Sequence, residues 1–233
     1  MTQKMNLQKG LVGHWTMDSQ DISNGTVCDR SGYKNHGQLK SGITIGTSGV
    51  VGESITSDGS GYIPTELFYN TGSLESVSIS CWYKSSSSSQ QMLVSSDRNE
   101  YYRLGVGTDG EDGLQWTVDS SDMVSNTSKS SLQDGVWHHL AVVFDSALSN
   151  DHKIYIDNIL DSKQSFYNSG IGSGATSYTH IGTGSESSSF DGSLGPDDRL
   201  NGSIDDVRIY HRGLSDNEIN ELYQMREQRS YNV

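Results

Sequence analysis

The sequence predicts an all-β fold in which short antiparallel strands form a sandwich or a barrel. The 233 residues include 26 glycines and only 2 prolines. Clusters of glycine, asparagine, aspartate and serine divide the chain into short segments, and branched and aromatic residues fill the segments between them. Strands separated by such turn clusters are typical of sandwiches and barrels. No stretch has the roughly 20 apolar residues of a membrane-spanning helix, so we expect no membrane insertion.

Strand candidates recur along most of the chain. In 77–83, apolar residues alternate with Ser78 and Ser80, which predicts one buried and one wetter face. In 137–144 both faces are mainly apolar, which predicts a strand in the middle of a sheet. The Asp-Asn pair at 157–158 tolerates positive φ and predicts a hairpin turn. The clearest strand candidates are 11–17, 77–83, 91–95, 101–106, 114–118, 137–144, 153–156, 178–181 and 204–210.

One helix is predicted near the C-terminus. Ser215 and Glu218 have the spacing of a capping box, in which each side chain bonds the backbone amide of the other residue. Leu214 and Ile219 are placed for a hydrophobic staple across the same cap. We therefore expect a short helix from about Asp216 onward.

The charge balance excludes one class of partner. The chain has 29 acidic and 16 basic residues, which gives a formal net charge of -13 at pH 7. Such a chain repels polyanions, so we expect no nucleic-acid binding. Aspartate outnumbers glutamate and lysine is scarce, a composition suited to high salt, where surface charges are screened. We therefore expect a halophilic origin.

The cysteines and the first residues bear on the cellular setting. Cys28 and Cys81 are the only cysteines, and two thiols make neither a disulfide framework nor a metal-binding knuckle. We expect both thiols to be free, with a single bridge as the alternative. The first residues have no apolar stretch of the kind found in a secretory signal, so none is expected. No shift of composition divides the chain, which predicts one domain.

Five short strings stand in a recognisable order. They are GLVGHWTMD at 10–18, DRSGYKNHG at 29–37, WHHLAVVFD at 137–145, IYID at 154–157 and NGSIDDVRIY at 201–210. In this order they resemble the LamG-like jelly-roll domain of the concanavalin A-like lectin and glucanase superfamily. The resemblance implies a domain at 10–224, preceded by an N-terminal arm at 1–9 and followed by a tail at 225–233.

The resemblance sharpens the predicted fold. It implies two curved antiparallel sheets of about six or seven strands each, with the first and last strands adjacent. Pairing of these two strands protects edges that could otherwise template aggregation, and it places Trp15 and Val207 in one core. The predicted fold class is therefore an all-β, two-sheet antiparallel jelly-roll sandwich with one short C-terminal helix.

Catalysis is not expected, although the superfamily contains glucanases. Retaining glycosidases need two carboxylates about 5 Å apart, and the superfamily's hydrolases resemble a Glu-x-Asp-x-Glu string that is absent from this sequence. Asp205 and Asp206 are adjacent, so their side chains should point to opposite faces. There is no Gly-x-Ser-x-Gly nucleophile elbow. We predict that the chain is not an enzyme.

A structural calcium ion is the metal that the sequence favours, because hard cations take carboxylate and carbonyl oxygens. In the superfamily's glucanases the Asp of a similar Asp-x-Val-Arg-x-Tyr string ligates calcium. Carried over to this sequence, the resemblance makes Asp205 the leading ligand, with Asp18 and Asp58, beside Gly59, as candidate partners. The alternative is that backbone amides or an arginine satisfy Asp205.

A sugar-binding platform is predicted in the middle of the chain. Sugar sites combine aromatic faces with polar side chains, and Tyr101, Tyr102, Arg103 and Trp116 lie on neighbouring strand candidates. Strand alternation should send either Tyr101 or Tyr102 away from the core. The alternative is that these aromatic residues are core. The long loop at 182–199 is a second candidate for recognition.

These observations predict a non-catalytic surface recognition or adhesion module that binds host or environmental glycans. The missing secretory signal favours a virion surface protein, such as a capsid decoration, turret or tail-fibre protein, with an extracellular or cell-surface location as the alternative. Other virion or surface proteins are expected partners, and we expect a homo-oligomer. Two other functions stay open: a purely structural assembly protein that binds no sugar, and an atypical glycan hydrolase.

Overall fold

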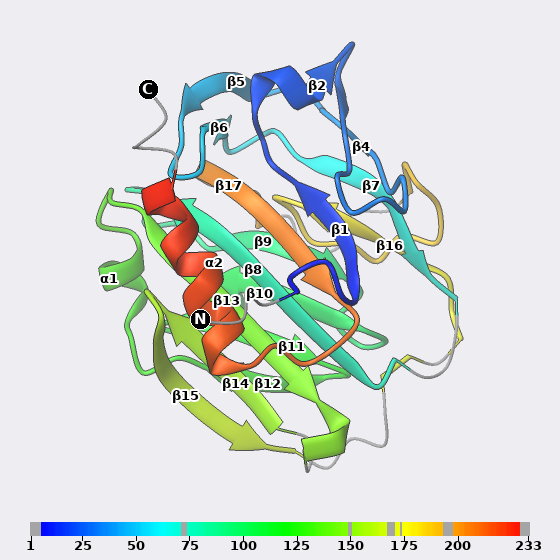
Figure 1. Ribbon diagram of the computed structural model, residues 1–233, viewed down its shortest axis with the longest axis vertical. Helices are drawn as coiled ribbons and strands as arrows, with labels where there is room; N and C mark the ends of the chain where they lie inside the picture. The colour runs from blue at the N-terminus through cyan, green and yellow to red at the C-terminus, as the bar shows by residue number, and fades with distance from the viewer. Residues whose placement is uncertain are drawn as a thin grey trace.

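The computed structural model is a sandwich of two antiparallel sheets with a helix across one outer face (Figure 1). It describes residues 6–70, 74–148, 151–166, 171–172, 174–192 and 198–228. This confirms the predicted fold class. In these residues no helix is long and apolar enough to cross a membrane.

The first sheet has eight strands and contains both ends of the domain. Register partners Trp15 and Val207 pair the first strand with the last, and both side chains lie in one core cluster, as predicted. The order across the sheet is β15 (Ile159–Ser165), β14 (Asp151–Ile156), β13 (His138–Asp145), β8 (Ser76–Lys84), β17 (Asn201–Tyr210), β6 (Glu53–Asp58) and β5 (Ile43–Ser48), with β1 (Leu11–Trp15) paired to β17.

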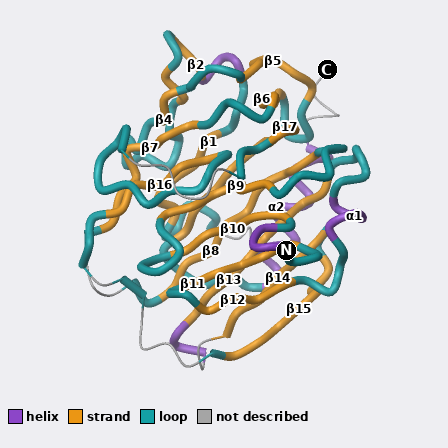
Figure 2. Tube along the Cα trace, turned by 180° about the vertical axis from the view of Figure 1, so that it is seen from behind, coloured by secondary structure: helices purple, strands orange, loops and turns teal. Residues whose placement is uncertain are grey.

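The second sheet has nine strands. Figure 2 shows the molecule from behind, where this sheet faces the viewer. Both sheets exceed the implied six or seven strands. In the second, three two-residue strands extend the edge beyond β7. The order is β12 (Ser121–Val124), β11 (Leu114–Val118), β10 (Tyr102–Val106), β9 (Gln91–Ser96), β16 (Ser177–Ile181), β7 (Ile63–Tyr69), β4 (Gly37–Gln38), β3 (Thr26–Val27) and β2 (Ile22–Ser23).

The predicted C-terminal helix is α2 (Asp216–Gln228), which crosses the outer face of the eight-stranded sheet (Figure 1). Its capping box is confirmed: the Ser215 amide donates to Glu218 Oε2 at 2.9 Å, and the Glu218 amide donates to Ser215 Oγ at 3.4 Å. The helix continues past residue 224, where the domain was expected to end. Besides α2, the described residues contain a one-turn helix, α1 (Lys129–Leu132), and 3-10 turns at Ser19–Asp21, Thr108–Gly110 and Ser146–Leu148.

Local details follow the sequence in most places. Asp157 and Asn158 have φ of 50° and 67°, which confirms the predicted hairpin turn. The first strand ends before residue 17 because Met17 has a φ of 64°, outside the strand region. Cys28 and Cys81 are free, as predicted. Burial raises the pKa of the Cys81 thiol to about 12, with a smaller effect from nearby carboxylates.

Candidate functional site

The predicted sugar platform is buried. Tyr101, Tyr102 and Trp116 are 0% exposed and Arg103 is 2% exposed. The Tyr102 and Trp116 rings lie 6.0 Å apart inside the sandwich, and the Tyr102 and Tyr69 hydroxyls are 2.8 Å apart. Solvent does not reach these rings, so the expectation that Tyr101 or Tyr102 faces outward is wrong.

The reason lies in where the strand begins. β10 starts at Tyr102, so strand alternation does not extend back to Tyr101. The Tyr101 amide donates to the Asp97 carbonyl at 3.1 Å, which turns the chain back toward the sandwich. Its ring then stacks on Tyr69, with centroids 4.8 Å apart, and its hydroxyl donates to the Ala175 carbonyl at 2.9 Å.

Arg103 is engaged by neighbouring side chains of its own sheet. Its guanidinium donates to the Asp109 carboxylate, to Thr117 Oγ1 at 3.3 Å and to Gln115 Oε1 at 3.4 Å. At 2% exposure the guanidinium has little surface left for a ligand. We therefore assign Arg103 a structural part in the nine-stranded sheet.

The leading calcium candidate, Asp205, is a buried carboxylate that is only half satisfied. It is 0% exposed. Oδ2 accepts the amides of Val50 and Val51 at 2.7 and 2.8 Å, whereas Oδ1 has no hydrogen-bond partner. The pKa of Asp205 is raised to about 7, mainly by burial; the charges of Asp206 and Asp18 add to this effect, and the two amides oppose it.

The structure brings Asp18, but not Asp58, toward Asp205. Asp18 is 3% exposed, and its Oδ1 accepts the Glu53 amide at 2.7 Å. Glu53 directly follows the turn whose Val50 and Val51 amides donate to Asp205. Asp58 pairs with Asn201 at the far end of β17, four residues and roughly 13 Å from Asp205. No group of three or more His, Cys, Asp or Glu able to hold a metal is found among the described residues.

Asp205 and Asp206 have different partners, although they are adjacent in the sequence. Arg208 Nε donates to Asp206 at 3.1 Å, and His14 Nε2 lies 2.8 Å from its other oxygen. Burial alone would raise the pKa of Asp206, but the Arg208 charge and the His14 hydrogen bond lower it well below its usual range. Asp206 is thus a buried ion-pair partner.

A polar groove lies at the rim where the two sheets meet, and we call it the serine groove. It has two parts, of about 640 and 430 Å³, which share Asn201. Four segments build it: β6 and the turn that follows it, the end of β8 with the loop between β8 and β9, Gly135 in the loop before β13, and residues 198–203 at the start of β17. The first part is lined by Thr56, Ser57, Lys84, Ser85, Ser86, Ser87, Ser88, Gly135, Asn201, Gly202 and Ser203, and the second by Asp58, Gly59, Ser89, Gln90, Asp198, Arg199 and Asn201.

The floor of the serine groove is held by a buried glutamine. Gln91 is 0% exposed; its Nε2 donates to Ser85 Oγ at 2.9 Å and its Oε1 accepts the Asn201 amide at 3.0 Å. Ser85 Oγ donates in turn to the Asn201 carbonyl at 2.6 Å. Ser86 and Ser88 are exposed above this network. The groove therefore presents hydroxyl groups from a loop whose backbone is already fixed.

Each part of the groove also has a cation beside an aromatic ring. Lys84 Nζ lies 4.9 Å from the centroid of the half-buried Trp137 ring. The Arg199 guanidinium carbon lies 5.3 Å from the centroid of Tyr62, and Arg199 Nη1 donates to the Ser60 carbonyl at 2.6 Å. Hydroxyls, charged donors and aromatic faces together are the groups that bind sugars.

The groove contains two carboxylates, Asp58 and Asp198, which a hydrolase would have to use. Asp58 accepts Ser60 Oγ at 2.6 Å and the Ser60 amide at 2.9 Å, and these bonds lower the pKa of Asp58. A general acid in glycoside hydrolysis needs the opposite, a raised pKa. Asp58 therefore suits the acceptance of hydrogen bonds better than proton donation.

Sequence reasoning located parts of the groove without assembling them. The serine run at 85–89 is a loop, as its composition indicates, and the loop at 182–199 supplies Asp198 and Arg199. Asp197 of that loop lies outside the described residues. The clearest sequence signal was the serine run next to Lys84. The groove residues at 198–203 lie more than a hundred positions further along the chain.

Comparison with known proteins identifies the family. The chain belongs to the concanavalin A-like lectin/glucanases superfamily, whose family model matches residues 57–220. This confirms the resemblance drawn from the sequence. No curated protein sequence matches the chain significantly.

Several solved structures with the same fold are described as binding domains. The binding domain of Paraclostridial Mosquitocidal Protein 1 is 16% identical with a TM-score of 0.68, covering 94% of this chain and 53% of that chain. The binding domain of botulinum neurotoxin DC, in complex with rat synaptotagmin II, is 16% identical with a TM-score of 0.62, covering 95% and 53%. The chain thus spans about half the length of these toxin domains.

A third similar structure is a shorter domain. Domain 4 of AbnA, an extracellular arabinanase from Geobacillus stearothermophilus, was solved in complex with arabinotriose. It is 20% identical with a TM-score of 0.63, and the match covers 92% of this chain and 98% of that chain. At these identities the likeness establishes the fold of the chain.

Proposed function

We propose that the chain is a non-catalytic module that recognises glycans, and that the serine groove is its sugar-binding site. The main support is the groove itself, which presents exposed hydroxyls and cations on a loop fixed by buried Gln91. Because its donors are already ordered, a sugar would bind without a large entropic cost. Domain 4 of AbnA, of the same fold, was solved with a sugar.

A glycan array followed by titration tests this proposal. Asn201→Ala and Lys84→Ala each remove a groove side chain, and loss of one hydrogen bond should weaken binding about three- to tenfold. Asn217→Ala, exposed on α2, is the matched control and should bind as the unaltered chain does. Silence on the array, or equal binding by all variants, would contradict the proposal.

A second candidate, structural assembly without sugar binding, is favoured by one surface. The edge strand β15 and a nearby loop expose Ile159 at 70%, Leu160 at 45% and Val136 at 52%. An unpaired strand edge with apolar residues can pair with another chain, and we propose a homo-oligomer through this edge. Light scattering should give an oligomer for the unaltered chain and a monomer for Ile159→Lys.

We propose that the groove does not hydrolyse the sugar it binds. Support comes from the lowered pKa of Asp58, one of its two carboxylates. Incubation with cell-envelope polysaccharide should release no reducing sugar. Release that disappears in Asp198→Asn would revive the atypical hydrolase.

We also propose a structural calcium ion held by Asp205 and Asp18. The buried Asp205 Oδ1 without a partner fits a cation, because a carboxylate oxygen in that state is costly unless something compensates it. With two carboxylates close together, backbone carbonyls would supply the other ligands. Bound calcium would neutralise this buried charge and fix the 49–53 turn against β17.

The proposed setting is an exterior surface, on a virion or a cell, in high salt. The net charge of -13 supports the high-salt part. Immunogold labelling of purified virions and of host cells would distinguish the two locations, and labelling confined to the cell interior would contradict both.

A further inference from the structure

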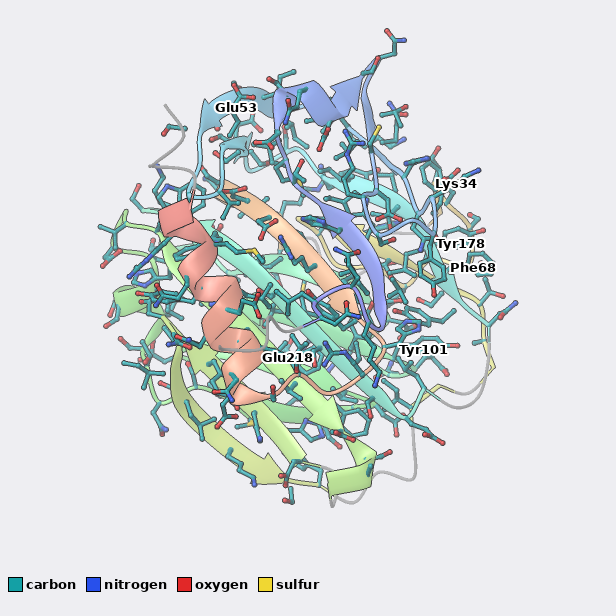
Figure 3. All side chains as sticks on the ribbon, in the orientation of Figure 1. Lys34, Glu53, Phe68, Tyr101, Tyr178 and Glu218 are labelled. Atoms are coloured by element: carbon teal, nitrogen blue, oxygen red, sulfur yellow. The ribbon has the colours of Figure 1, made fainter. Side chains whose placement is uncertain are left out.

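Phe68, which is exposed, and Tyr178, which is half-buried, form an aromatic pair on the outer face of the nine-stranded sheet (Figure 3). They are register partners on β7 and β16, and their rings stack with centroids 5.1 Å apart and planes 24° apart. Phe68 is 46% exposed, although its neighbours Leu67 and Tyr69 are buried. Strand alternation therefore presents Phe68 to solvent.

A third ring joins the pair from the long loop. Phe190 meets the Tyr178 ring edge-on, with centroids 6.5 Å apart. It belongs to the same loop that supplies Asp198 and Arg199 to the serine groove. We call Phe68, Tyr178 and Phe190 the aromatic platform.

The surroundings of the platform are polar. Glu66 and Asn70, beside Phe68 on the chain, are exposed. Asp191, next to Phe190, pairs with Lys40 at 2.5 Å. A protein-binding surface is usually a contiguous apolar patch, whereas a few aromatic faces among carboxylates and amines match a sugar, which has an apolar ring face and a rim of hydroxyls.

Strand β16 and a chain of ring contacts lead from the platform to the serine groove. Two residues along β16 from Tyr178, the His180 ring lies 5.9 Å from Tyr62, and Tyr62 lies under Arg199, which lines the groove. Phe68 and Tyr62 are six residues apart, which corresponds to roughly 20 Å along a strand. One sugar ring cannot span this distance.

Charge further restricts the ligand. The groove combines Lys84 and Arg199 with Asp58 and Asp198, so its charges balance, and the whole chain carries -13. A polyanionic glycan would meet repulsion and no cationic excess in the groove. A neutral chain of sugars fits this charge distribution.

We propose that the ligand is an extended neutral oligosaccharide, with one end in the serine groove and further sugar rings stacked on the aromatic platform. This inference rests on the proposed function of the groove. It adds a second contact surface and makes affinity depend on chain length, because only a long glycan reaches both surfaces.

Titration calorimetry with linear gluco-, xylo- and arabino-oligosaccharides of two and six units tests it on the full chain. The six-unit member of at least one series should bind at least tenfold more tightly than its two-unit member. Phe68→Ala removes one aromatic contact, so it should weaken the binding of the six-unit sugar about tenfold. The affinity for the two-unit sugar should change by less than about twofold. Phe68→Trp should retain both affinities. Ile45→Ala, at a site 43% exposed on β5, is the control and should change neither.

The outcomes separate the two claims. Binding that is independent of length, or equal effects of Phe68→Ala on short and long sugars, overturns the platform and leaves the groove standing. No binding to any series overturns both. Self-association that Phe68→Ala abolishes, without any effect on sugar affinity, would make the platform a protein contact and overturn the inference. Thermal unfolding of each variant checks that it is folded.

Discussion

The outer faces of the two sheets differ in what covers them. On the eight-stranded sheet, Leu214, Ile219 and Leu222 of the helical segment pack on Val143 and Tyr155, and each is at most 3% exposed. On the nine-stranded sheet, Phe68 of the aromatic platform stays 46% exposed. One face is sealed by apolar packing and contributes to stability. The other presents aromatic rings and polar groups, where we propose that a ligand binds.

Acid should give the largest effect and should act on both faces. His139, beneath α2, His180, beneath Tyr62, and His152 are at most 1% exposed, and burial lowers the pKa of each to about 4. In the unfolded chain each of these histidines has a pKa of about 6.5. The stability from neutral histidine is therefore complete above about pH 6.5 and lost as pH falls toward 4. Asp205, with its raised pKa, opposes this loss between about pH 7 and 4.

Urea denaturation at pH 7, 5.5 and 4.5 measures the effect. Since one pKa unit corresponds to about 1.4 kcal/mol, the three buried histidines outweigh one aspartate, and the free energy of unfolding should fall by several kcal/mol. His152 lies between Phe144 and Phe166, 5.0 and 4.7 Å away, and neither of its ring nitrogens has a partner. His152→Phe should make stability less dependent on pH. A flat profile, or an unchanged slope in this variant, would contradict the account.

Removing a side chain from the sealed face should cost about 2 to 5 kcal/mol of unfolding free energy. Leu222→Ala deletes a side chain that is 0% exposed against the sheet, which leaves a cavity. Ile45→Ala, 43% exposed on β5, is the matched control and should cost less than about 0.5 kcal/mol. Sugar affinity should be unchanged in both. If Leu222→Ala weakens sugar binding while the protein remains folded, the two faces are coupled.

Calcium should stabilise the chain by about 2.7 kcal/mol at a hundredfold excess over its Kd. A change of this size raises the Tm by roughly 5 to 10 °C for a domain of this length. Asp205→Asn keeps an oxygen for the Val50 and Val51 amides, but should abolish the response to calcium. Asp58→Asn should retain it. Equal responses in the two variants, or none in the unaltered chain, would exclude the proposed ligands.

Salt should have the smallest effect. Screening of the -13 net charge reduces self-repulsion, so the free energy of unfolding should rise by about 1 kcal/mol between low and molar NaCl. Affinity for a neutral sugar should stay constant over the same range. Stability and solubility independent of salt would count against a halophilic origin.

Local sequence patterns predict much of the fold. The turn at 157–158 and the Ser215–Glu218 capping box each act within a few residues, and both are confirmed. The wetter face expected for 77–83 is wrong: Ser78 and Ser80 are 0% and 2% exposed, because the segment that leads into α2 covers this face. The pairing of Trp15 with Val207 followed from motif order, because the resemblance implies adjacent end strands. The position of Tyr101 could not be predicted, since it depends on the turn that precedes β10.

The sites depend on residues that only the folded chain brings together. Tyr102 points into the sandwich, whereas Phe68 points away from it, and the pattern of a single strand does not show which of its faces is the inner one. The serine groove joins Ser85 and Asn201 through buried Gln91, and Ser57 lines it from β6. Contacts between residues more than a hundred positions apart, such as Gln91 and Asn201, leave no short sequence pattern. A run of serines indicates a loop and not the partners of that loop.

The most direct measurement of the groove is an NMR titration of the labelled chain with the sugar that binds most tightly on the array. The backbone amides of Ser86, Ser88 and Gly202 should shift in proportion to occupancy, while those of β15 and α2 stay in place. Shifts confined to the β15 edge, with the amides of the serine loop unmoved, would contradict a sugar site at this rim.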